Sequence, residues 1–332
     1  MSRAAPGQAG AIVALAADPA ATAGAVAEVA ETGPPDLASK VPPELRSPLS
    51  ALVGLLGSFE RVVVAFSGGA DSAFLSFVAT ACLGEGRVQC ATAVSPSLAP
   101  EELADCEALA REWRLSWRPV RTDELERPDY VANQGDRCYH CKAELMEVLE
   151  PLARAEGATV VLGVNLDDLG DYRPGQRAAA ERGASFPLVA AGFTKAMVRE
   201  ASLALGLRTW DKPAAACLAS RVPEGTPVTL GVLSSVARAE SGLRRLGFTQ
   251  LRVRHYGELA RLEVELSLLP RVMDQREAVI GAVKGAGYRY VTLDLEGFRS
   301  GNLNRTTDRP PEATRPPIPE PGAAGGRPGV GR

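Results

Sequence analysis

The sequence predicts an α/β fold, in which a doubly wound parallel sheet is followed by a smaller C-terminal α+β domain. Short apolar runs alternate with helical patterns between residues 61 and 165, which is the order typical of a parallel sheet. A glycine-rich turn directly follows the first apolar run. From about residue 228 the order becomes helix, strand, strand, helix, strand, which indicates a separate domain with an antiparallel sheet.

The parallel sheet is predicted from four apolar runs. RVVVAF, at residues 61–66, is short, β-branched and apolar, as buried parallel strands are. Further strands are predicted at VQCATAV, LSWRPV and TVVLGVN, and the helices between them at SAFLSFVATACL, APEELADCEALAREWR and CKAELMEVLEPLARAEG. Such sheets bind ligands beyond the carboxyl ends of their strands, so a site is expected at that edge.

The remaining segments complete the domain plan. The first domain is predicted over residues 46–227 and the second over residues 228–305. The second contains a helix, a hairpin of QLRVRHY and ARLEVEL closed by a tight turn, a helix over 270–285 and the strand YRYVTLDL. Residues 1–45 and 306–332 are rich in proline and small residues. They bury too little apolar surface to offset the entropy of ordering, so disordered tails are predicted there.

The composition narrows the classes of function. The 332 residues carry a formal net charge of −3, which argues against a nucleic-acid partner, because such proteins usually show a basic surplus. No apolar run approaches the ~20 residues of a membrane span, and no signal peptide is apparent. Six cysteines without an export signal predict reduced thiols, so we expect a cytoplasmic protein.

The segment VVVAFSGGADSAFL is the most informative part of the chain. Gly68 and Gly69 allow a sharp turn and a close approach of the backbone to a ligand. The helix that follows offers unpaired N–H groups and the positive end of its dipole, which together favour an anion. Ser67 and Ser72 add hydroxyl donors, and Asp71 is placed to cap the helix or to hold Mg²⁺. We therefore predict a phosphate-binding loop.

The loop differs from the commonest ATPase motif. The lysine of G-x-x-x-x-G-K-[ST] is absent from it. The plain alternative is a glycine-rich turn between strand and helix, capped by Asp71 or Ser72. Its position directly after a buried strand and before a helix favours the phosphate loop.

The stretch GDRCYHCK places Cys138 and Cys141 in a C-x-x-C pair. Such a pair can be a redox dithiol, half of a metal site or a chance arrangement. A helix is predicted directly after the pair, which keeps the redox interpretation open, because thioredoxin-like pairs open a helix. For a zinc site the sequence offers no second C-x-x-C and no histidine pair.

Ser-Gly-Gly-x-Asp-Ser after the first strand resembles the PP-loop of N-type ATP pyrophosphatases, which cleave ATP between the α and β phosphates. The loop, GDRCYHCK and three further segments together resemble the LarE-type ATP-dependent sacrificial sulfur transferases. Those segments are GVNLDDLGDYRPGQ, DKPAAACLASRVPEGTPVT and LEGFRSGNLN. The similarity covers about residues 47–305. In that family a pyridinium dicarboxylate mononucleotide is adenylated and receives sulfur, and the thiocarboxylate formed becomes part of a nickel-pincer cofactor.

The resemblance implies ATP and Mg²⁺ as cofactors, a small-molecule nucleotide as substrate and a homo-oligomer, without a nucleic-acid or membrane partner. Cys217, in AAACLASR, matches the sulfur-bearing cysteine of the family, and a nearby cation such as Arg221 is expected to favour its thiolate. The thiolate attacks the adenylate, and breakage of the Cβ–S bond then leaves dehydroalanine. An inert buried thiol is the alternative for Cys217.

Some members of the resembled family carry a [4Fe–4S] cluster. Cys138, Cys141 and Cys217 number three, and three thiolates can hold such a cluster with one iron open to an extra sulfide. Sulfur would then come from that sulfide, and Cys217 would stay intact. A redox or persulfide role and a structural role for the C-x-x-C pair remain the alternatives.

The resemblance also points to substrate-binding side chains in the second domain. Arg252 and Arg254 lie two apart on a predicted strand, so both point to one face and could hold a phosphate or carboxylates. Together with Glu240 on the preceding helix, they resemble the substrate centre of the family. The alternative is a solvated face, on which the arginines meet cross-strand partners such as Glu263 and Glu265.

Other residues of the resembled segments are assigned to the nucleotide and to Mg²⁺. Gly163 and Asn165 follow the fourth strand and are assigned to the nucleotide, and Arg137 is expected to touch the adenylate phosphate. Asp168 is assigned, with Asp71, to Mg²⁺. The same loop contains two further aspartates, Asp167 and Asp171. A polar loop with aspartate turns is the alternative.

Three other functions share part of these features. An ammonia-dependent ligase of the NAD synthetase type uses such a loop but has no use for Cys217. A tRNA thiolation enzyme combines the loop with cysteines but needs a nucleic-acid surface, against which the net charge argues. A non-catalytic module would bind ATP without releasing pyrophosphate.

Overall fold

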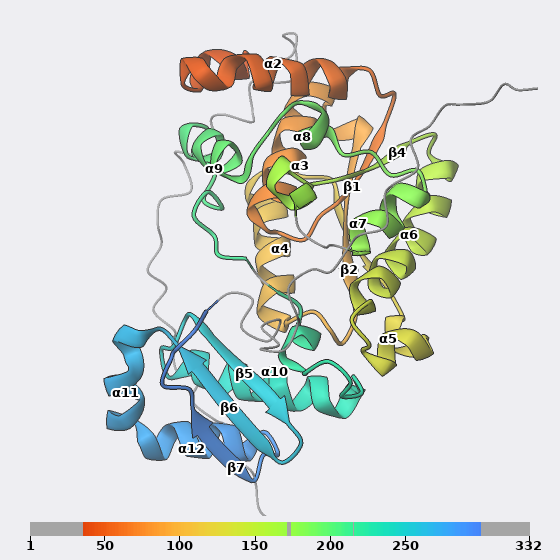
Figure 1. Ribbon diagram of the computed structural model, residues 1–332. Helices are drawn as coiled ribbons and strands as arrows, with labels where there is room; N and C mark the ends of the chain where they lie inside the picture. The colour runs from red at the N-terminus through yellow and green to blue at the C-terminus, as the bar shows by residue number, and fades with distance from the viewer. Residues whose placement is uncertain (1–35, 171–173, 215, 300–332) are drawn as a thin grey trace, which may run out of the picture.

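The computed structural model describes residues 36–170, 174–214 and 216–299 and shows two domains (Figure 1). The strands of the larger domain are β1 (Val62–Ala65), β2 (Val88–Val94), β3 (Trp117–Arg121) and β4 (Thr159–Leu162). Its helices are α2 (Pro43–Gly57), α3 (Ala70–Leu83), α4 (Pro100–Glu112), α5 (Pro128–Ala132), α6 (Arg137–Ala155), α7 (Pro174–Glu181), α8 (Pro187–Ala190) and α9 (Lys195–Ala204). Within the described ranges, no helix is both long enough and apolar enough to cross a bilayer.

The smaller domain and the short helical turns complete the element list. The smaller domain contains α10 (Leu230–Arg245), β5 (Leu251–Tyr256), β6 (Leu259–Val264), α11 (Leu269–Asp274), α12 (Arg276–Gly285) and β7 (Tyr290–Leu293). The 3₁₀ helices are η1 (Leu37–Lys40), η2 (Glu85–Arg87), η3 (Glu124–Glu126), η4 (Leu166–Gly170), η5 (Leu218–Arg221) and η6 (Leu266–Leu268). The predicted tail from residue 306, the first 35 residues and Asp171 lie outside the described ranges.

Strands β1 to β4 form one parallel sheet in the order β3-β2-β1-β4, which confirms the predicted sheet. Val62 of β1 pairs with Val88 of β2 on one side and with Thr159 of β4 on the other. The chain therefore builds outward from β1 to β3 and then returns across the sheet to add β4 beside β1. In open α/β sheets, ligands bind where the strand order reverses in this way, which here is at the carboxyl ends of β1 and β4.

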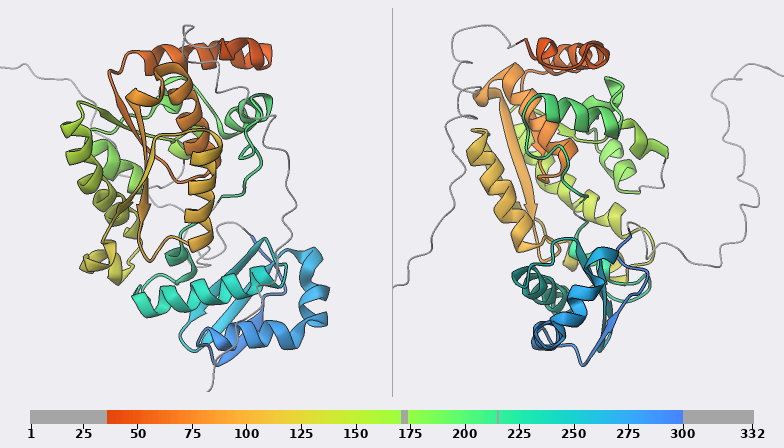
Figure 2. Two further views of the ribbon diagram at one scale, coloured as in Figure 1. Left: turned by 180° about the vertical axis from the view of Figure 1, so that it is seen from behind. Right: turned by 90° about the vertical axis from the view of Figure 1, so that its left-hand side faces the viewer.

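Helices cover both faces of this sheet (Figures 1 and 2), as expected of a doubly wound fold. Val62 and Val64 of β1 pack into one core with residues of α2, α3, α4 and α9. Val63, whose side chain points the other way, packs into a second core with residues of α6 and α7. The strand is apolar on both sides for this reason, and this is the pattern by which it was predicted.

The folded part begins earlier than the predicted boundary at residue 46. Leu37 of η1, Val41 and Leu45 are all buried, and they join the first core together with the apolar face of α2. The boundary therefore falls inside α2. The leucine repeat of α2 begins at residue 45, and the two apolar side chains before it suffice to extend the buried face by one turn.

The smaller domain has the predicted element order but a mixed sheet. Strands β5 and β6 form an antiparallel hairpin, whereas β7 pairs parallel to β6. The expected antiparallel sheet is thus wrong for β7, because the connection from β6 to β7 crosses over through α11 and α12. The helix predicted over 270–285 is split at Gln275 into these two helices. Figure 1 shows this domain, in cyan to blue, below the larger one and beside the start of α4.

Candidate functional site

The glycine loop lies at the carboxyl end of β1, at the point where the strand order reverses. Gly68 has a φ of +68°, which an L side chain rarely adopts, and a Cβ there would lie 2.7 Å from Cys106 Sγ. Gly69 is the N-cap of α3 in extended conformation, and no side chain caps this helix start. The first N–H groups of α3 therefore point out of the loop, as an anion site requires.

Two serine hydroxyls fix the shape of the loop. Ser67 N donates to Ser72 Oγ at 3.2 Å, and the hydroxyls of Ser67 and Ser72 lie 3.1 Å apart. Ser72 Oγ in turn donates to Gly69 O at 3.2 Å. The serines thus hold the loop closed on itself, so its backbone is shaped before any ligand arrives.

The loop after β4 packs directly against the start of α3. A Cβ at Gly163 would lie 2.7 Å from Ser72 N and 2.8 Å from Asp71 C, so only glycine allows this approach. Two residues on, Asn165 Nδ2 donates to Asp71 Oδ1 at 3.1 Å. Asp168 Oδ2 accepts from Asn165 N at 3.1 Å. The residues predicted for the nucleotide and Mg²⁺ in the segments after β1 and β4 therefore form one connected group at the switch point.

Two lysines that the sequence analysis did not single out lie at this loop. Lys195, the first residue of α9, pairs with Asp71 Oδ2 at 2.6 Å. Lys212 Nζ would lie 3.7 Å from a Cβ at Gly68, and it pairs with Asp105 at 2.7 Å and Glu102 at 2.9 Å. The fold therefore supplies from residues 195 and 212 the cations that the loop motif lacks. No local motif marks either lysine, although Lys212 falls inside DKPAAACLASR.

The charge of Lys212 is secured by its partners. Burial by itself disfavours the ammonium form, but the carboxylates of Asp105 and Glu102 outweigh it and raise the pKa of Lys212. Lys212 is therefore a cation at neutral pH. Two of its three N–H groups suffice for the two carboxylates, so a further donor is available to a ligand at the loop.

Cys217 lies on the segment that leaves the loop at Lys212. Cys217 comes five positions after Lys212, so the extended chain spans no more than about 18 Å between them. Directly after Cys217, Leu218 N donates to Ser97 O at 2.8 Å, and Ser97 follows the carboxyl end of β2. Cys217 itself is exposed, whereas Leu218 and Ala219 are buried. Position 217 is thus anchored at the same edge of the sheet as the glycine loop, with an accessible side chain.

A buried ion pair fixes the backbone around Cys217. Arg221 donates through Nε and Nη2 to the two oxygens of Glu240, at 2.8 and 2.9 Å. Its Nη1 donates to Ala216 O at 2.6 Å and to Cys217 O at 2.9 Å. The donors of Arg221 are thus directed to Glu240, to the backbone and to the hydroxyl of Ser220.

Glu240 is fully buried on α10 and serves as a hub. Besides Arg221, its oxygens accept from Val253 N at 3.0 Å and from Arg244 at 3.1 Å. Burial raises the pKa of Glu240, but the hydrogen bonds and charges of Arg221 and Arg244 outweigh burial and hold it below its usual value. The predicted catalytic carboxylate is therefore an ionised group that positions its neighbours in this structure.

The two arginines of β5 differ in their surroundings. Arg254 is buried and donates to Ser220 O at 2.9 Å and to Glu263 at 2.8 Å, so the expected cross-strand partner is present. Arg252 is partly exposed, stacks on the ring of Phe298 at 4.9 Å and donates to Ala214 O at 3.3 Å. Both arginines thus hold carbonyls of the Cys217 segment, and Arg252 alone of the pair has an accessible guanidinium.

The C-x-x-C pair lies within the first turns of α6, because this helix begins at Arg137, before the predicted start. Arg137 is hydrogen-bonded to Asn133. Cys138 is exposed, and Cys141 is half-buried against the cluster that contains Leu218 and Ala219. The pair therefore lies beside the Cys217 segment, although Cys141 and Cys217 are 76 positions apart in the sequence.

The three thiols are close enough to influence one another. Burial, the Glu124 carboxylate and the nearby Cys217 thiol raise the pKa of Cys141 to about 12. Desolvation and the Cys217 thiol also raise the pKa of Cys138. Both cysteines of the pair are therefore protonated at neutral pH in this conformation, which is the less reactive form.

Within the described ranges, no group of three His, Cys, Asp or Glu side chains is arranged to hold a metal ion. A cluster held by the three thiols stays a prediction. Mg²⁺ makes a smaller demand, because it commonly binds one or two carboxylates together with nucleotide phosphates. Asp71 lies beside the loop and could bind Mg²⁺ in place of its partner Lys195. Asp168 is linked to Asp71 through Asn165, which is hydrogen-bonded to both.

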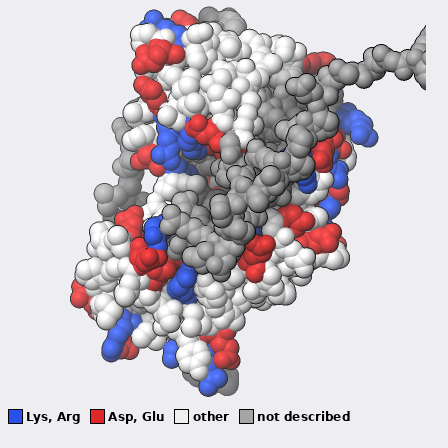
Figure 3. Space-filling model, viewed as in Figure 1, with Lys and Arg blue, Asp and Glu red and all other residues white. Residues whose placement is uncertain are grey.

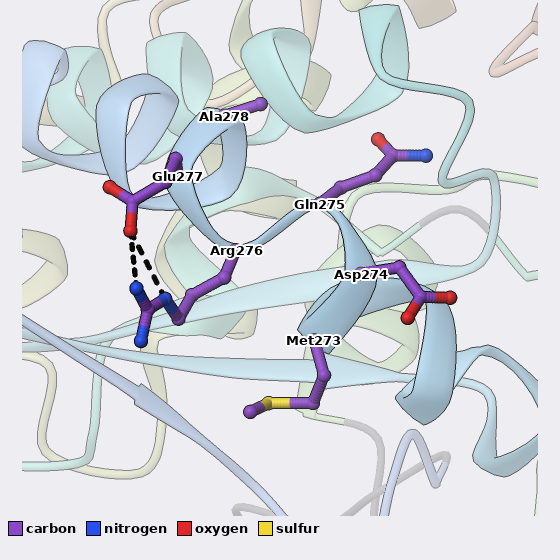
Figure 4. A pocket seen from close by; sticks show the side chains of 6 residues that line it. All are labelled: Met273, Asp274, Gln275, Arg276, Glu277 and Ala278. Atoms are coloured by element: carbon purple, nitrogen blue, oxygen red, sulfur yellow. Dashed lines mark hydrogen bonds and ion pairs between the residues drawn. The ribbon is translucent and has the colours of Figure 1, made fainter.

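The surface adds two observations. On the face in Figure 3, the basic and acidic side chains of the described residues are interspersed, and they form no continuous basic stripe. A hollow at the break between α11 and α12 (Figure 4) is lined by Met273, Asp274, Gln275, Arg276, Glu277 and Ala278. It contains no predicted site residue, so the switch point of the large sheet is the candidate site.

The chain was compared with known proteins. No family model matches it. It is 46% identical over 264 residues to an uncharacterized protein of Synechocystis, covering 79% of this chain and 98% of the relative. An uncharacterized protein of Methanocaldococcus jannaschii is 27% identical over 242 residues, covering 73% of this chain and 92% of the relative.

One relative carries a functional name. The pyridinium-3,5-bisthiocarboxylic acid mononucleotide synthase of Lactiplantibacillus plantarum is 36% identical over 266 residues. The match covers 80% of this chain and 96% of the synthase. On this similarity, the chain belongs to the LarE-type family of that synthase.

Proposed function

We propose that this protein is an ATP-dependent sulfur transferase. It adenylates pyridinium-3,5-dicarboxylate mononucleotide and converts the carboxylates to thiocarboxylates for a nickel-pincer cofactor. One observation carries the proposal: a single segment leads from the glycine loop, at Lys212, to the exposed thiol of Cys217 at the same edge of the sheet. The name of the synthase from Lactiplantibacillus plantarum supports the choice of substrate and product.

In the first half-reaction, ATP binds with its phosphates at the start of α3. The N–H groups of the loop and the ammonium of Lys212 offset the phosphate charge. Phosphate oxygens also attract Lys195, so Asp71 can exchange this partner for Mg²⁺. A substrate carboxylate oxygen attacks the α phosphorus and pyrophosphate leaves. The acyl adenylate that forms carries AMP as a good leaving group.

In the second half-reaction, the Cys217 thiolate attacks the acyl carbon and AMP leaves. The thioester then loses the Cα proton of residue 217 and its Cβ–Sγ bond breaks. The product departs as a thiocarboxylate, and dehydroalanine remains in the chain. An exposed side chain on a fixed backbone suits both steps, because the sulfur must reach the substrate while Cα stays in place.

The substrate is expected between the loop and the smaller domain. Arg252 offers a partly exposed guanidinium to a phosphate or carboxylate. Burial and the neighbouring cation Arg221 lower the pKa of Arg252 to about 10. An anion bound at the Arg252 guanidinium would therefore stabilise the positive charge of Arg252. Arg254 and Glu240 are assigned to positioning of the Cys217 segment, because both are buried and paired.

One experiment tests the proposal. The protein is incubated with ATP, Mg²⁺ and the pyridinium dicarboxylate mononucleotide, and both protein and small molecules are analysed by mass spectrometry. We expect sulfur in the nucleotide and release of AMP and pyrophosphate. Loss of the mass of H₂S at Cys217 marks the sacrificial route. Sulfur transfer with intact Cys217, dependent on Cys138 and on reconstituted iron, marks the cluster route instead.

Variants sharpen the assignment. Cys217→Ala should abolish sulfur transfer and leave ATP binding intact, because residue 217 lies outside the loop. Retained transfer in this variant would contradict the role of Cys217. A product that contains nitrogen from ammonia would favour the ligase of the NAD synthetase type. ATP binding without pyrophosphate release would favour a non-catalytic module.

A further inference from the structure

Release of sulfur from Cys217 is a β-elimination, and its rate depends on the Cys217 carbonyl group. Removal of the Cα proton leaves negative charge on the carbon next to that carbonyl. The carbonyl oxygen shares this charge as an enolate oxygen. A fixed hydrogen-bond donor at an oxygen where charge develops lowers the barrier of such a step.

The structure places one cation at this oxygen. Arg221 Nη1 donates to Cys217 O at 2.9 Å, and the residue is only 2% exposed. We propose that Arg221 is a catalytic residue of the sulfur-release step, in which its guanidinium stabilises the enolate oxygen of residue 217. This inference rests on the proposed function in its sacrificial form.

The step balances as follows. Water, which reaches the exposed side chain of Cys217, accepts the Cα proton. The electron pair of the Cα–H bond forms the Cα–Cβ double bond by way of the enolate. The Cβ–Sγ bond breaks, and its electron pair leaves with the sulfur of the thiocarboxylate. No oxidant or reductant is required.

The guanidinium is held ready for this task. Two parallel hydrogen bonds to Glu240 fix its plane, so Nη1 has little freedom to turn away from the carbonyl. Glu240 does not cancel the local positive charge, because Arg244 pairs with the same carboxylate. Arg252 adds a third cation close to these groups. Negative charge that develops at Cys217 O therefore meets a preorganised positive environment.

Nη1 also contacts Ala216 O and Ser220 Oγ, which raises the plainer reading that Arg221 only shapes the segment. The two readings differ in what they predict. A shaping role should be shared by other anchors of the segment, such as the buried side chain of Leu218. An electronic role belongs to the guanidinium alone and acts on the elimination step alone.

A chemical probe tests the inference without ATP or the nucleotide substrate. The reagent 2,5-dibromohexanediamide alkylates a cysteine twice, and the cyclic sulfonium formed then loses the Cα proton and a neutral cyclic sulfide to give dehydroalanine. Peptide mass spectrometry separates the alkylated form from dehydroalanine, so the elimination rate is measured apart from alkylation. Cys138 is also exposed and is the reference in the same molecule: Arg137 contacts its thiol, and no arginine of the described residues donates to its carbonyl.

The variants are chosen to keep the core intact. Arg221→Gln combined with Glu240→Gln removes the cation without leaving a buried charge unpaired. Arg221→Lys keeps a cation, but an ammonium group cannot donate two parallel hydrogen bonds to Glu240 and also donate to Cys217 O. Leu218→Ala loosens the same segment and leaves the guanidinium in place. Circular dichroism checks that each variant is folded.

We expect elimination at Cys217 to be on the order of 100-fold faster than at Cys138. In the double variant, the elimination rate at Cys217 should fall to the rate at Cys138. Arg221→Lys should give an intermediate rate at Cys217. Leu218→Ala should keep most of the acceleration over Cys138. Equal rates at Cys217 and Cys138 in the unmodified chain would overturn the inference. So would an unchanged rate in the double variant, or an equal loss in Leu218→Ala. Because the probe bypasses adenylation, a failure of sulfur transfer leaves this result unaffected.

Discussion

Replacement of Gly163 with alanine should push the nucleotide loop away from β4 and weaken ATP binding. The added Cβ would lie 2.7 Å from Ser72 N and 2.8 Å from Asp71 C and Ser72 Cα. All three are backbone atoms at the start of α3, so no side-chain rotation can relieve the contact. Gly163 has no positive φ, so the effect is purely one of space.

The magnitude follows from these distances. Ordinary contact begins at 3.4 Å, so the helix start must retreat by about 0.7 Å. Overpacking of this kind typically costs about 1–3 kcal/mol. The ligand-free loop can relax by moving away, but ATP requires the original geometry, so the strain returns on binding. The dissociation constant for ATP should therefore rise by about 5- to 150-fold.

The assay is titration calorimetry with ATP, together with urea unfolding. Gly281→Ala is the matched control, because a Cβ at that position of α12 meets nothing within 4 Å. It should stabilise the protein by about 0.5–1 kcal/mol, since alanine is the better helix former, and leave ATP binding unchanged. An ATP affinity for Gly163→Ala equal to that of the control would refute the placement of the nucleotide at this contact.

Three further predictions concern other parts of the site. Lys212→Met should weaken ATP binding about tenfold, as measured by calorimetry, because a charged hydrogen bond to phosphate is lost. The affinity for adenosine, which has no phosphate, should stay unchanged. Asp105→Asn keeps the lysine and should not weaken ATP binding in this way. Glu240→Leu should lower the free energy of unfolding by about 3–5 kcal/mol in urea, since Arg221 is left buried and unpaired, and adding Arg221→Met should restore most of it. Burial lowers the pKa of His255, so the unfolded chain binds the proton more readily and stability should fall as the pH drops below about 6.5; His255→Gln should flatten this pH dependence.

Much of the fold was predictable because its signals are local. The strand of Val62–Ala65 is apolar on both faces, and a run of this kind fits few environments other than a covered parallel sheet. The direction of β7 was not predictable in this way, since its own residues do not encode which neighbour they pair with. That choice is made by the crossover through α11 and α12, which is a property of the connection.

In the candidate site, too, local sequence predicted some features, whereas distant parts of the chain set the others. The glycine turn and its serines are contiguous, so one motif places them, and the family resemblance places Cys217. The partners of these groups come from distant positions. Lys195 reaches Asp71 across 124 residues, and Arg221 finds Glu240 across 19. Sequence alone showed that Arg252 and Arg254 share a face, but it could not show that one is buried against Glu263 while the other reaches the surface.

A cysteine that gives up its sulfur must satisfy two opposing conditions. Its thiol has to be accessible to a substrate, whereas its Cα has to be held while a bond to Cβ breaks. In this chain the side chain of Cys217 is exposed, and both domains hold the backbone around it. The larger domain anchors the neighbouring Leu218 at the sheet edge, and arginines of the smaller domain bind Ala214 O and Ser220 O on either side of Cys217. Under the proposed function, these contacts mean that the smaller domain positions Cys217 in addition to binding the substrate.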